Sequence, residues 1–171
     1  MRKIIVVNGL KKEAIREFIR LIQNQNSILD NPFSYITDID YYERIEYLAQ
    51  ICGWRGDEDF ITKLGSLLSD YSDLPYETVK NFINKVSYAS NPETSKFIIF
   101  VTNISPNDAA RLKEDFDNVT TVFIEKEGGP RSAIEQYKLD NILSITYDYA
   151  VVGWKLEESA ETFFSILDSN T

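Results

Sequence analysis

The N-terminal stretch from Arg2 to Ile22 constrains the fold of this chain more than any other. Ile4 to Val7 form a β-branched run, which is typical of a strand buried on both faces, and Asn8-Gly9 follows it as a turn. Apolar residues then recur at helical spacing, at positions 14, 15, 18, 19, 21 and 22. The sequence therefore predicts a strand, a tight turn and a helix, whose positive end could receive a phosphate.

The turn lacks the residues of a phosphate-binding loop. A loop of the form G-x-x-x-x-G-K-[ST], counted from Gly9, would need Gly, Lys and Ser or Thr at positions 14, 15 and 16. The chain has Ala14, Ile15 and Arg16 there. Nearby lysines at positions 11 and 12 could supply positive charge, or they could be ordinary solvated positions of the first helical turn.

Composition limits both the size of the protein and its chemistry. With 171 residues, 43% of them hydrophobic, we expect one domain over residues 1–171 with a single substantial core. The chain has one cysteine, Cys52, and no histidine. An internal disulfide, the usual zinc ligand sets and Ser-His or Cys-His catalysis within this chain are therefore excluded.

The charge of the chain indicates which partners it can have. A net charge of -9 and a pI near 4.6 argue against binding nucleic acid through its phosphates. The acidic excess either keeps the protein soluble or forms a surface that meets a basic partner. The sequence shows no charged-then-apolar leader and no apolar run of membrane-spanning length, so we expect a cytoplasmic protein without membrane contact.

The rest of the chain alternates between predicted strands and helices. Further strands are expected at residues 33–37, 96–102, 119–124 and 149–152, and further helices at 41–51, 60–69, 75–86, 106–116 and 156–167. Strands separated by helices imply right-handed crossovers. The predicted fold class is therefore three-layer α/β/α with a mainly parallel five-stranded sheet and a helical insertion, at about residues 40–90, between strands 2 and 3.

Two aspartates follow the second predicted strand directly. Asp38 and Asp40 lie where the ends of strands in an α/β sheet bind ligands, so they could hold a sugar hydroxyl or a metal. Either aspartate could instead cap the helix that follows.

Several local patterns occur together in one order along the chain. They are Ile4 to Gly9, Tyr42 to Trp54 with the turn Gly53-Trp54-Arg55-Gly56-Asp57, Leu64 to Tyr76, Tyr147 to Val152, and Leu156-Glu157-Glu158. In this arrangement the chain resembles the small P-loop nucleotide kinases, particularly the deoxynucleoside monophosphate kinases of tailed phages and related short proteins of low-GC bacteria. The resemblance covers nearly the whole chain and implies a kinase-like domain with a nucleotide cleft.

The chain departs from that family at both phosphate-handling segments. The family's phosphate loop wraps the phosphates with backbone amides and supplies a lysine and a magnesium-binding hydroxyl, whereas the loop here is shortened. Where related kinases carry an Arg-Arg-Pro-Gly type lid, this chain has Glu125 to Arg131, and Arg131 is the only arginine that could act as a lid. We therefore expect the ordinary phosphoryl-transfer chemistry to be lost, with no cofactor.

One functional hypothesis is a pseudokinase that acts by binding. It would contact an unidentified protein partner, could form a homodimer, and could be a phage or mobile-element protein that interferes with a host protein. The expected interaction surface is Tyr41, Trp54, Arg55, Asp57 and Tyr76, because aromatic side chains favour interfaces.

The alternative hypothesis is a divergent nucleotide kinase that uses ATP and magnesium. It would bind ATP at the turn, use an aspartate near the acceptor and close Arg131 over the phosphates. The residues of this remnant nucleotide cleft would be Asn8, Gly9, Lys11, Lys12, Asp38, Asp40 and Arg131. A nucleotide sensor that binds without turnover is the intermediate case.

Overall fold

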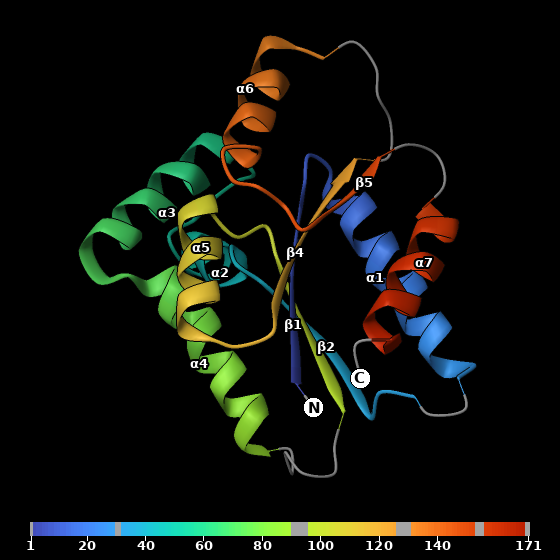
Figure 1. The fold of residues 1–171 in the computed structure, drawn as a ribbon. Coiled ribbons are helices and arrows are strands. Elements are labelled where there is room, and N and C mark those ends of the chain that lie inside the picture. The colour runs from blue at the N-terminus through green and yellow to red at the C-terminus, as the bar shows by residue number, and fades with distance from the viewer. Residues whose placement is uncertain (1, 30–31, 90–95, 126–130, 153–155, 170–171) are drawn as a thin grey trace.

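Strands and helices alternate along the chain (Figure 1). The structure, a computed structural model, describes residues 2–29, 32–89, 96–125, 131–152 and 156–169. Its elements are β1 (Arg2–Gly9), α1 (Lys12–Ser27), β2 (Tyr35–Asp40), α2 (Glu43–Ile51), α3 (Glu58–Ser72), α4 (Leu74–Ala89), β3 (Phe97–Thr102), α5 (Pro106–Asp115), β4 (Val119–Glu125), α6 (Ala133–Ile142), β5 (Tyr149–Val152) and α7 (Leu156–Ser169).

The strands form one parallel sheet in the order β2-β3-β1-β4-β5. The central strand β1 pairs with β3 on one side and with β4 on the other. Three helices, α2, α3 and α4, lie between β2 and β3 in the chain. The predicted fold class, with its parallel five-stranded sheet and its helical insertion, is confirmed.

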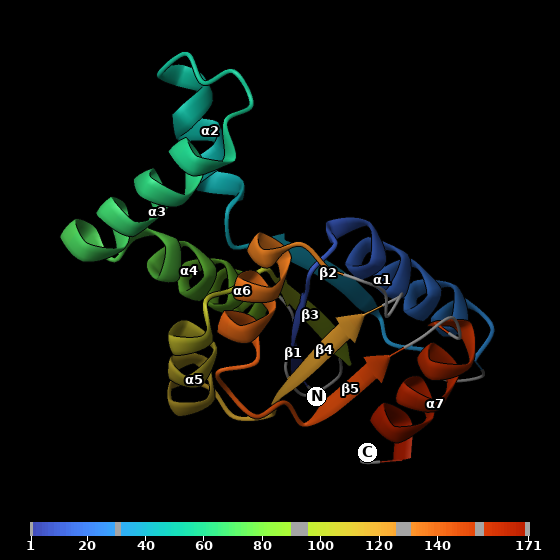
Figure 2. The ribbon, with the colours of Figure 1, turned by 90° about the horizontal axis from the view of Figure 1, so that it is seen from above.

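Helices cover both faces of the sheet (Figures 1 and 2). Successive side chains of a strand point to opposite faces, so Ile5 and Val7 of β1 pack with α1 and α7, whereas Ile4 and Val6 pack with α4 and α5. Because helices follow the strands on both sides, β1 and β3 are buried along their apolar lengths, as the sequence predicts.

Helices α2 and α3, which we call the helical arm, project from the sheet (Figure 2). Ile45, Ala49 and Ile61 form a small core of their own within the arm. Other large apolar side chains of the arm face outward, and Leu67 is 63% exposed and Tyr71 88% exposed. The arm therefore offers apolar surface that the rest of the described chain does not cover.

Two elements differ from the expectation. The strand β2 continues through Asp40, so both aspartates belong to the strand rather than to the segment after it. Helix α6 was not predicted, although Ser132 and Glu135 form a capping box at its start. The Ser-x-x-Glu spacing was the signal for it in the sequence. Of the segment from Glu125 to Arg131, where related kinases carry a lid, residues 126–130 lie outside the described residues.

Candidate functional site

The order of the strands creates a switch point beside β1. Helix α1 leads from β1 toward β2, whereas α5 leads from β3 back across β1 to β4. The two helices pack on opposite faces of the sheet. In parallel α/β sheets, ligands bind in the crevice beyond the carboxyl ends of neighbouring strands whose following helices lie on opposite faces of the sheet. A ligand site is therefore expected at the carboxyl ends of β1, β2 and β3.

The turn between β1 and α1 is short. Strand β1 ends at Gly9 and α1 begins at Lys12, so Leu10 and Lys11 are the only residues between them. The backbone N–H of Ala14 already donates to the carbonyl of Lys11 at 3.1 Å, which is a helical contact. A loop that wraps a phosphate with converging amides has no room in this turn.

Gly9 is required by the packing of this turn. Its backbone lies in register with Ile124 of β4. A Cβ atom placed on Gly9 would lie 2.4 Å from the carbonyl oxygen of Ile124. The glycine that suggested a phosphate site is therefore explained by close backbone approach between β1 and β4.

A cavity of about 310 Å³ lies at the switch point, between α1, the end of β2, the start of α2 and the end of β3. It brings together three of the predicted cleft residues, Lys12, Asp38 and Asp40. The lining residues are Lys12, Ile15, Arg16, Ile19, Asp38, Asp40, Glu43, Glu46, Thr102 and Asn103. Charged and polar side chains dominate this lining.

Lys12 is paired across the cavity. Its Nζ lies 2.8 Å from Oε1 of Glu46 on α2. Burial lowers the pKa of Lys12, but the hydrogen bond to Glu46 and the charges of Asp40 and Glu46 outweigh it and raise that pKa. Lys12 is therefore a charged residue that connects the start of α1 with α2.

Asp40 joins the ends of three strands. Its carboxylate accepts hydrogen bonds from the backbone N–H of Tyr42 at 2.9 Å and from Nδ2 of Asn103 at 2.6 Å. Asn103, in the left-handed region with φ 58°, also donates its backbone N–H to Val7 of β1. Asp40 therefore accepts a hydrogen bond from the backbone just before α2, which is close to the capping role expected of it. Asp38, in contrast, is exposed and lines the cavity.

The other predicted cleft residues lie outside this cavity lining. Asn8 is 2% exposed and donates to the carbonyl of Ile104 at 3.0 Å and to the hydroxyl of Tyr147 at 3.1 Å. Lys11 is exposed at the start of α1. Arg131 forms an ion pair with Glu125 at the end of β4. Asn8 and Arg131 thus make internal contacts.

The expected interaction surface is divided by the fold. Tyr41 and Tyr76 are buried, which corrects their placement on the surface, because each ring packs beside the sheet. Trp54 is half-buried and donates from Nε1 to the carbonyl of Asp57 at 2.7 Å. Arg55 and Asp57 are exposed, and the side chain of Asp57 caps α3.

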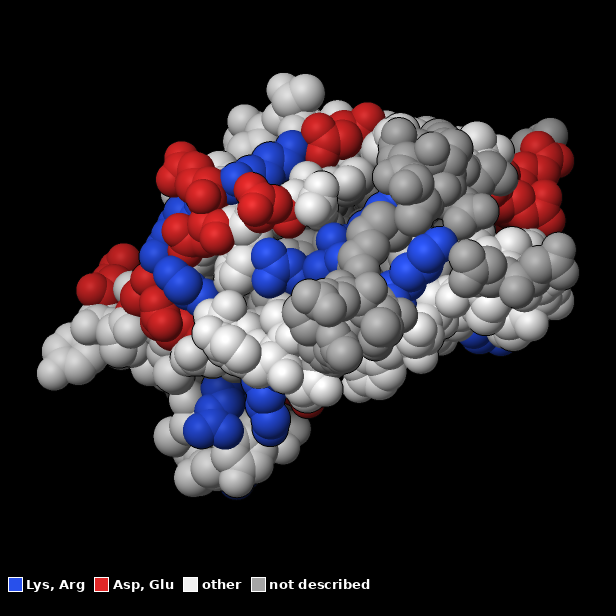
Figure 3. Space-filling model, turned by 60° about the horizontal axis from the view of Figure 1, so that its bottom comes forward, with Lys and Arg blue, Asp and Glu red and all other residues white. Residues whose placement is uncertain are grey.

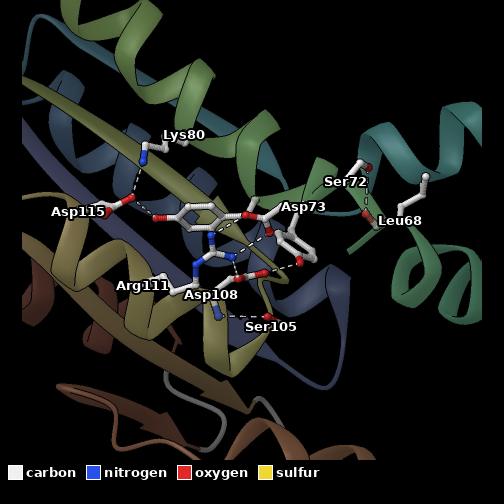
Figure 4. A network of polar contacts seen from close by, with 10 residues as sticks. Leu68, Ser72, Asp73, Lys80, Ser105, Asp108, Arg111 and Asp115 are labelled. Carbon is white, nitrogen blue, oxygen red and sulfur yellow. Dashed lines mark hydrogen bonds and ion pairs between the residues drawn. The ribbon is translucent and has the colours of Figure 1, made fainter. Parts of the chain in front are cut away.

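A polar network under the arm was missed by the sequence reasoning (Figure 4). Arg111 of α5 donates to both carboxylate oxygens of Asp73, at 2.9 and 2.5 Å, and to Asp108 at 2.8 Å. Its guanidinium carbon lies 3.7 Å from the ring centroid of Tyr76. Burial and the hydrogen bond to Asp108 raise the pKa of Tyr41. The network fastens the α3–α4 corner to α5.

The charges of the molecule do not form one uniform surface. On the face drawn in Figure 3, Lys and Arg side chains lie among acidic ones. Within the described ranges, no group of three or more Asp, Glu or Cys side chains is placed to hold a metal ion. No helix in the part of the chain that the structure describes is long and apolar enough to cross a membrane.

Comparisons with known proteins relate this chain to others by fold. No protein-family model and no curated protein sequence matches it. A sugar kinase from Janibacter sp. has a TM-score of 0.55 and 11% sequence identity, over 98% of this chain and 95% of that chain. Shikimate kinase from Bacteroides thetaiotaomicron has a TM-score of 0.47 and 12% identity, over 97% of this chain and 98% of that chain. The first likeness supports a kinase-like fold.

Proposed function

We propose that this chain is a kinase-fold protein that transfers no phosphate and acts by binding. The observation that carries the proposal is the two-residue turn from Gly9 to Lys12. Phosphoryl transfer depends on a loop of backbone amides around the phosphates and on cations at the outer phosphates. The short turn offers no such loop, and it amounts to a degenerate form of the phosphate-binding segment.

The cations near the cleft support the same proposal. Lys12 is paired with Glu46, and Arg131 is paired with Glu125. A cation that serves a phosphate in the transition state would first have to leave its carboxylate partner. Removing one electrostatic donor from an active site raises the barrier by about 3 kcal/mol. We therefore expect no useful phosphoryl transfer.

The helical arm is the surface on which we expect a protein partner to bind. Leu67 and Tyr71 are exposed on α3, and Tyr47 and Ile51 are exposed on α2. Exposed apolar and aromatic side chains on one projecting unit favour a protein interface. A phage or mobile-element protein that blocks a host protein would use such a surface.

Nucleotide binding and phosphate transfer test the proposal. Thermal unfolding would be followed with ATP, dATP and nucleoside monophosphates at millimolar concentration, each with magnesium, and transfer would be followed by ³¹P NMR. A ligand at 100 times its dissociation constant stabilises the folded state by about 2.7 kcal/mol, which gives a clear rise in Tm. We expect no rise and no transfer. Magnesium-dependent transfer would overturn the proposal.

A divergent kinase is the second candidate, and the position of the cavity favours it. Asp38 and Asp40 lie at the end of β2, and the cavity reaches α1 at Lys12. On this alternative, ATP raises Tm in the presence of magnesium, and Lys12→Ala removes the rise. A rise in Tm without transfer would instead identify a nucleotide sensor.

Substitutions on the arm test the binding surface. For the double variant Leu67→Ser with Tyr71→Ser, we expect the same Tm as for the wild type. We expect this variant to lose the cross-links to partner proteins that the wild type forms. Tyr88→Ser is the matched control, because Tyr88 is equally exposed but lies on α4. Equal cross-linking of all three proteins would exclude the arm as the interface.

A further inference from the structure

We propose that the cavity at the switch point binds a small hydroxylated amine through its ammonium group. The inference rests on the proposed function, because it treats the cavity as a binding site without phosphate transfer. The class of ligand follows from the side chains of the cavity that the fold leaves unpaired.

Carboxylates outnumber cations in the cavity. Its lining holds four acidic side chains, those of Asp38, Asp40, Glu43 and Glu46, and two basic ones, those of Lys12 and Arg16. Lys12 and Glu46 neutralise each other at 2.8 Å. The remaining charges leave the cavity negative, which disfavours an anion such as a phosphate and favours a cation.

The side chains of Asp38, Glu43 and Thr102, which line the cavity, have no hydrogen-bond or ion-pair partner within the described ranges. The carboxylates of Asp38 and Glu43 are exposed, and neither makes an ion pair or a side-chain hydrogen bond there. Thr102 is only 5% exposed, and its hydroxyl likewise has no partner among the described residues. Because Thr102 lines the cavity, its hydroxyl can both donate a hydrogen bond to a ligand there and accept one from it.

An organic amine fits these groups better than a metal ion. No three acidic side chains of the described residues are placed to hold a metal. An ammonium group needs fewer ligands, because it donates charge-assisted hydrogen bonds to separate carboxylates such as Asp38 and Glu43. Hydroxyl groups of the ligand can form hydrogen bonds with the side chains of Thr102 and Arg16.

The size of the cavity limits the ligand to a compact molecule. Its volume of about 310 Å³ lies at the lower end of the range of small-molecule pockets, roughly 300 to 1,000 Å³. A single sugar ring carrying an amine satisfies the size, the charge and the hydroxyl groups together. Glucosamine and ethanolamine are therefore suitable probes.

The test is an NMR titration of the ¹⁵N-labelled full chain in an amine-free buffer. Glucosamine and ethanolamine are compared with the neutral analogue glucose and the anionic analogue glucose 6-phosphate. We expect saturable shifts of the Asp38 and Thr102 amide signals with at least one amine, and much weaker effects with glucose and glucose 6-phosphate. Saturation by neither amine, or equal binding of glucose or its phosphate, overturns the inference.

Matched variants separate the cavity from the general attraction of amines to an acidic protein. Asp38→Asn should weaken amine binding about tenfold, because it removes a charge-assisted hydrogen bond. Thr102→Val should weaken it by a smaller factor. Asp70→Asn removes the same charge from an exposed position on α3 and should change nothing. Equal weakening by Asp38→Asn and Asp70→Asn would overturn the inference.

The outcomes also distinguish this inference from the proposed function. ATP-dependent phosphorylation of a bound probe, followed by ³¹P NMR, would refute the proposed function. Absence of amine binding together with absence of phosphate transfer would refute only the identity of the ligand.

Discussion

At the end of β1, the lack of a side chain on Gly9 allows β1 and β4 to approach each other closely. Gly9 lies opposite Ile124, and a Cβ atom on Gly9 would lie 2.4 Å from the carbonyl oxygen of that residue. Gly9→Ala must therefore displace the backbone of β4. We expect it to lower the free energy of unfolding by about 1–3 kcal/mol, as overpacking does, measured by urea unfolding. An unchanged urea midpoint would contradict this account of Gly9.

At the scale of elements, the corner between α3 and α4 is held by charge. Asp73 ends α3 in the left-handed region with φ 52°, and both of its oxygens accept hydrogen bonds from Arg111 of α5. The hydrogen bonds from Arg111 outweigh burial and lower the pKa of Asp73. The folded protein therefore takes up this proton at a lower pH than the unfolded chain does.

The sign of the pH dependence follows from that lowered pKa. The stabilisation is fully present above the unfolded pKa of Asp, about 4, and is lost as the pH falls through the folded pKa. Asp73→Asn should therefore lower Tm at pH 7, and the difference from wild type should shrink as the pH falls below 4. Asp70→Asn on the same helix is the control. A difference in Tm independent of pH would show that the pair contributes no charge effect.

At the scale of the whole molecule, the sheet and the arm have cores of different size. The strands β1 and β3 contribute to the apolar layers on both faces of the sheet, whereas the arm has the small core around Ile45, Ala49 and Ile61. Segments with few buried apolar contacts open locally at a lower free energy than the central strands do. Hydrogen exchange should therefore be fastest in α2 and α3 among the helices of the insertion.

Hydrogen exchange with mass spectrometry measures this difference directly. Peptides from β1 and β3 should be the last to exchange, and peptides from α2 and α3 should exchange well before α4, which packs on the sheet. A chain that behaves as one unit would show equal protection in the arm and in the strands, and that result would contradict a separable arm.

Most of the fold could be predicted because its signals are local. The apolar run of Ile4 to Val7 and the cap at Ser105 each depend on a few neighbouring residues. Helix α6 was missed although its capping box at Ser132 is visible in the sequence, because its apolar residues have almost no periodicity and Ile134 and Tyr137 face outward. Tyr41 and Tyr76 were expected at the surface, since their aromatic type alone does not determine burial.

The sequence alone predicts the five strands, every helix except α6, the parallel sheet and the short turn after Gly9. It does so because hydrophobic periodicity and helix caps depend on residues that are close together in the chain. The tertiary structure alone decided which charges meet. Lys12 pairs with Glu46 and Arg111 pairs with Asp73, although each pair is far apart in the chain. Which of the carboxylates and hydroxyl groups of the cavity stay unpaired depends on such long-range pairing, and no local pattern encodes it.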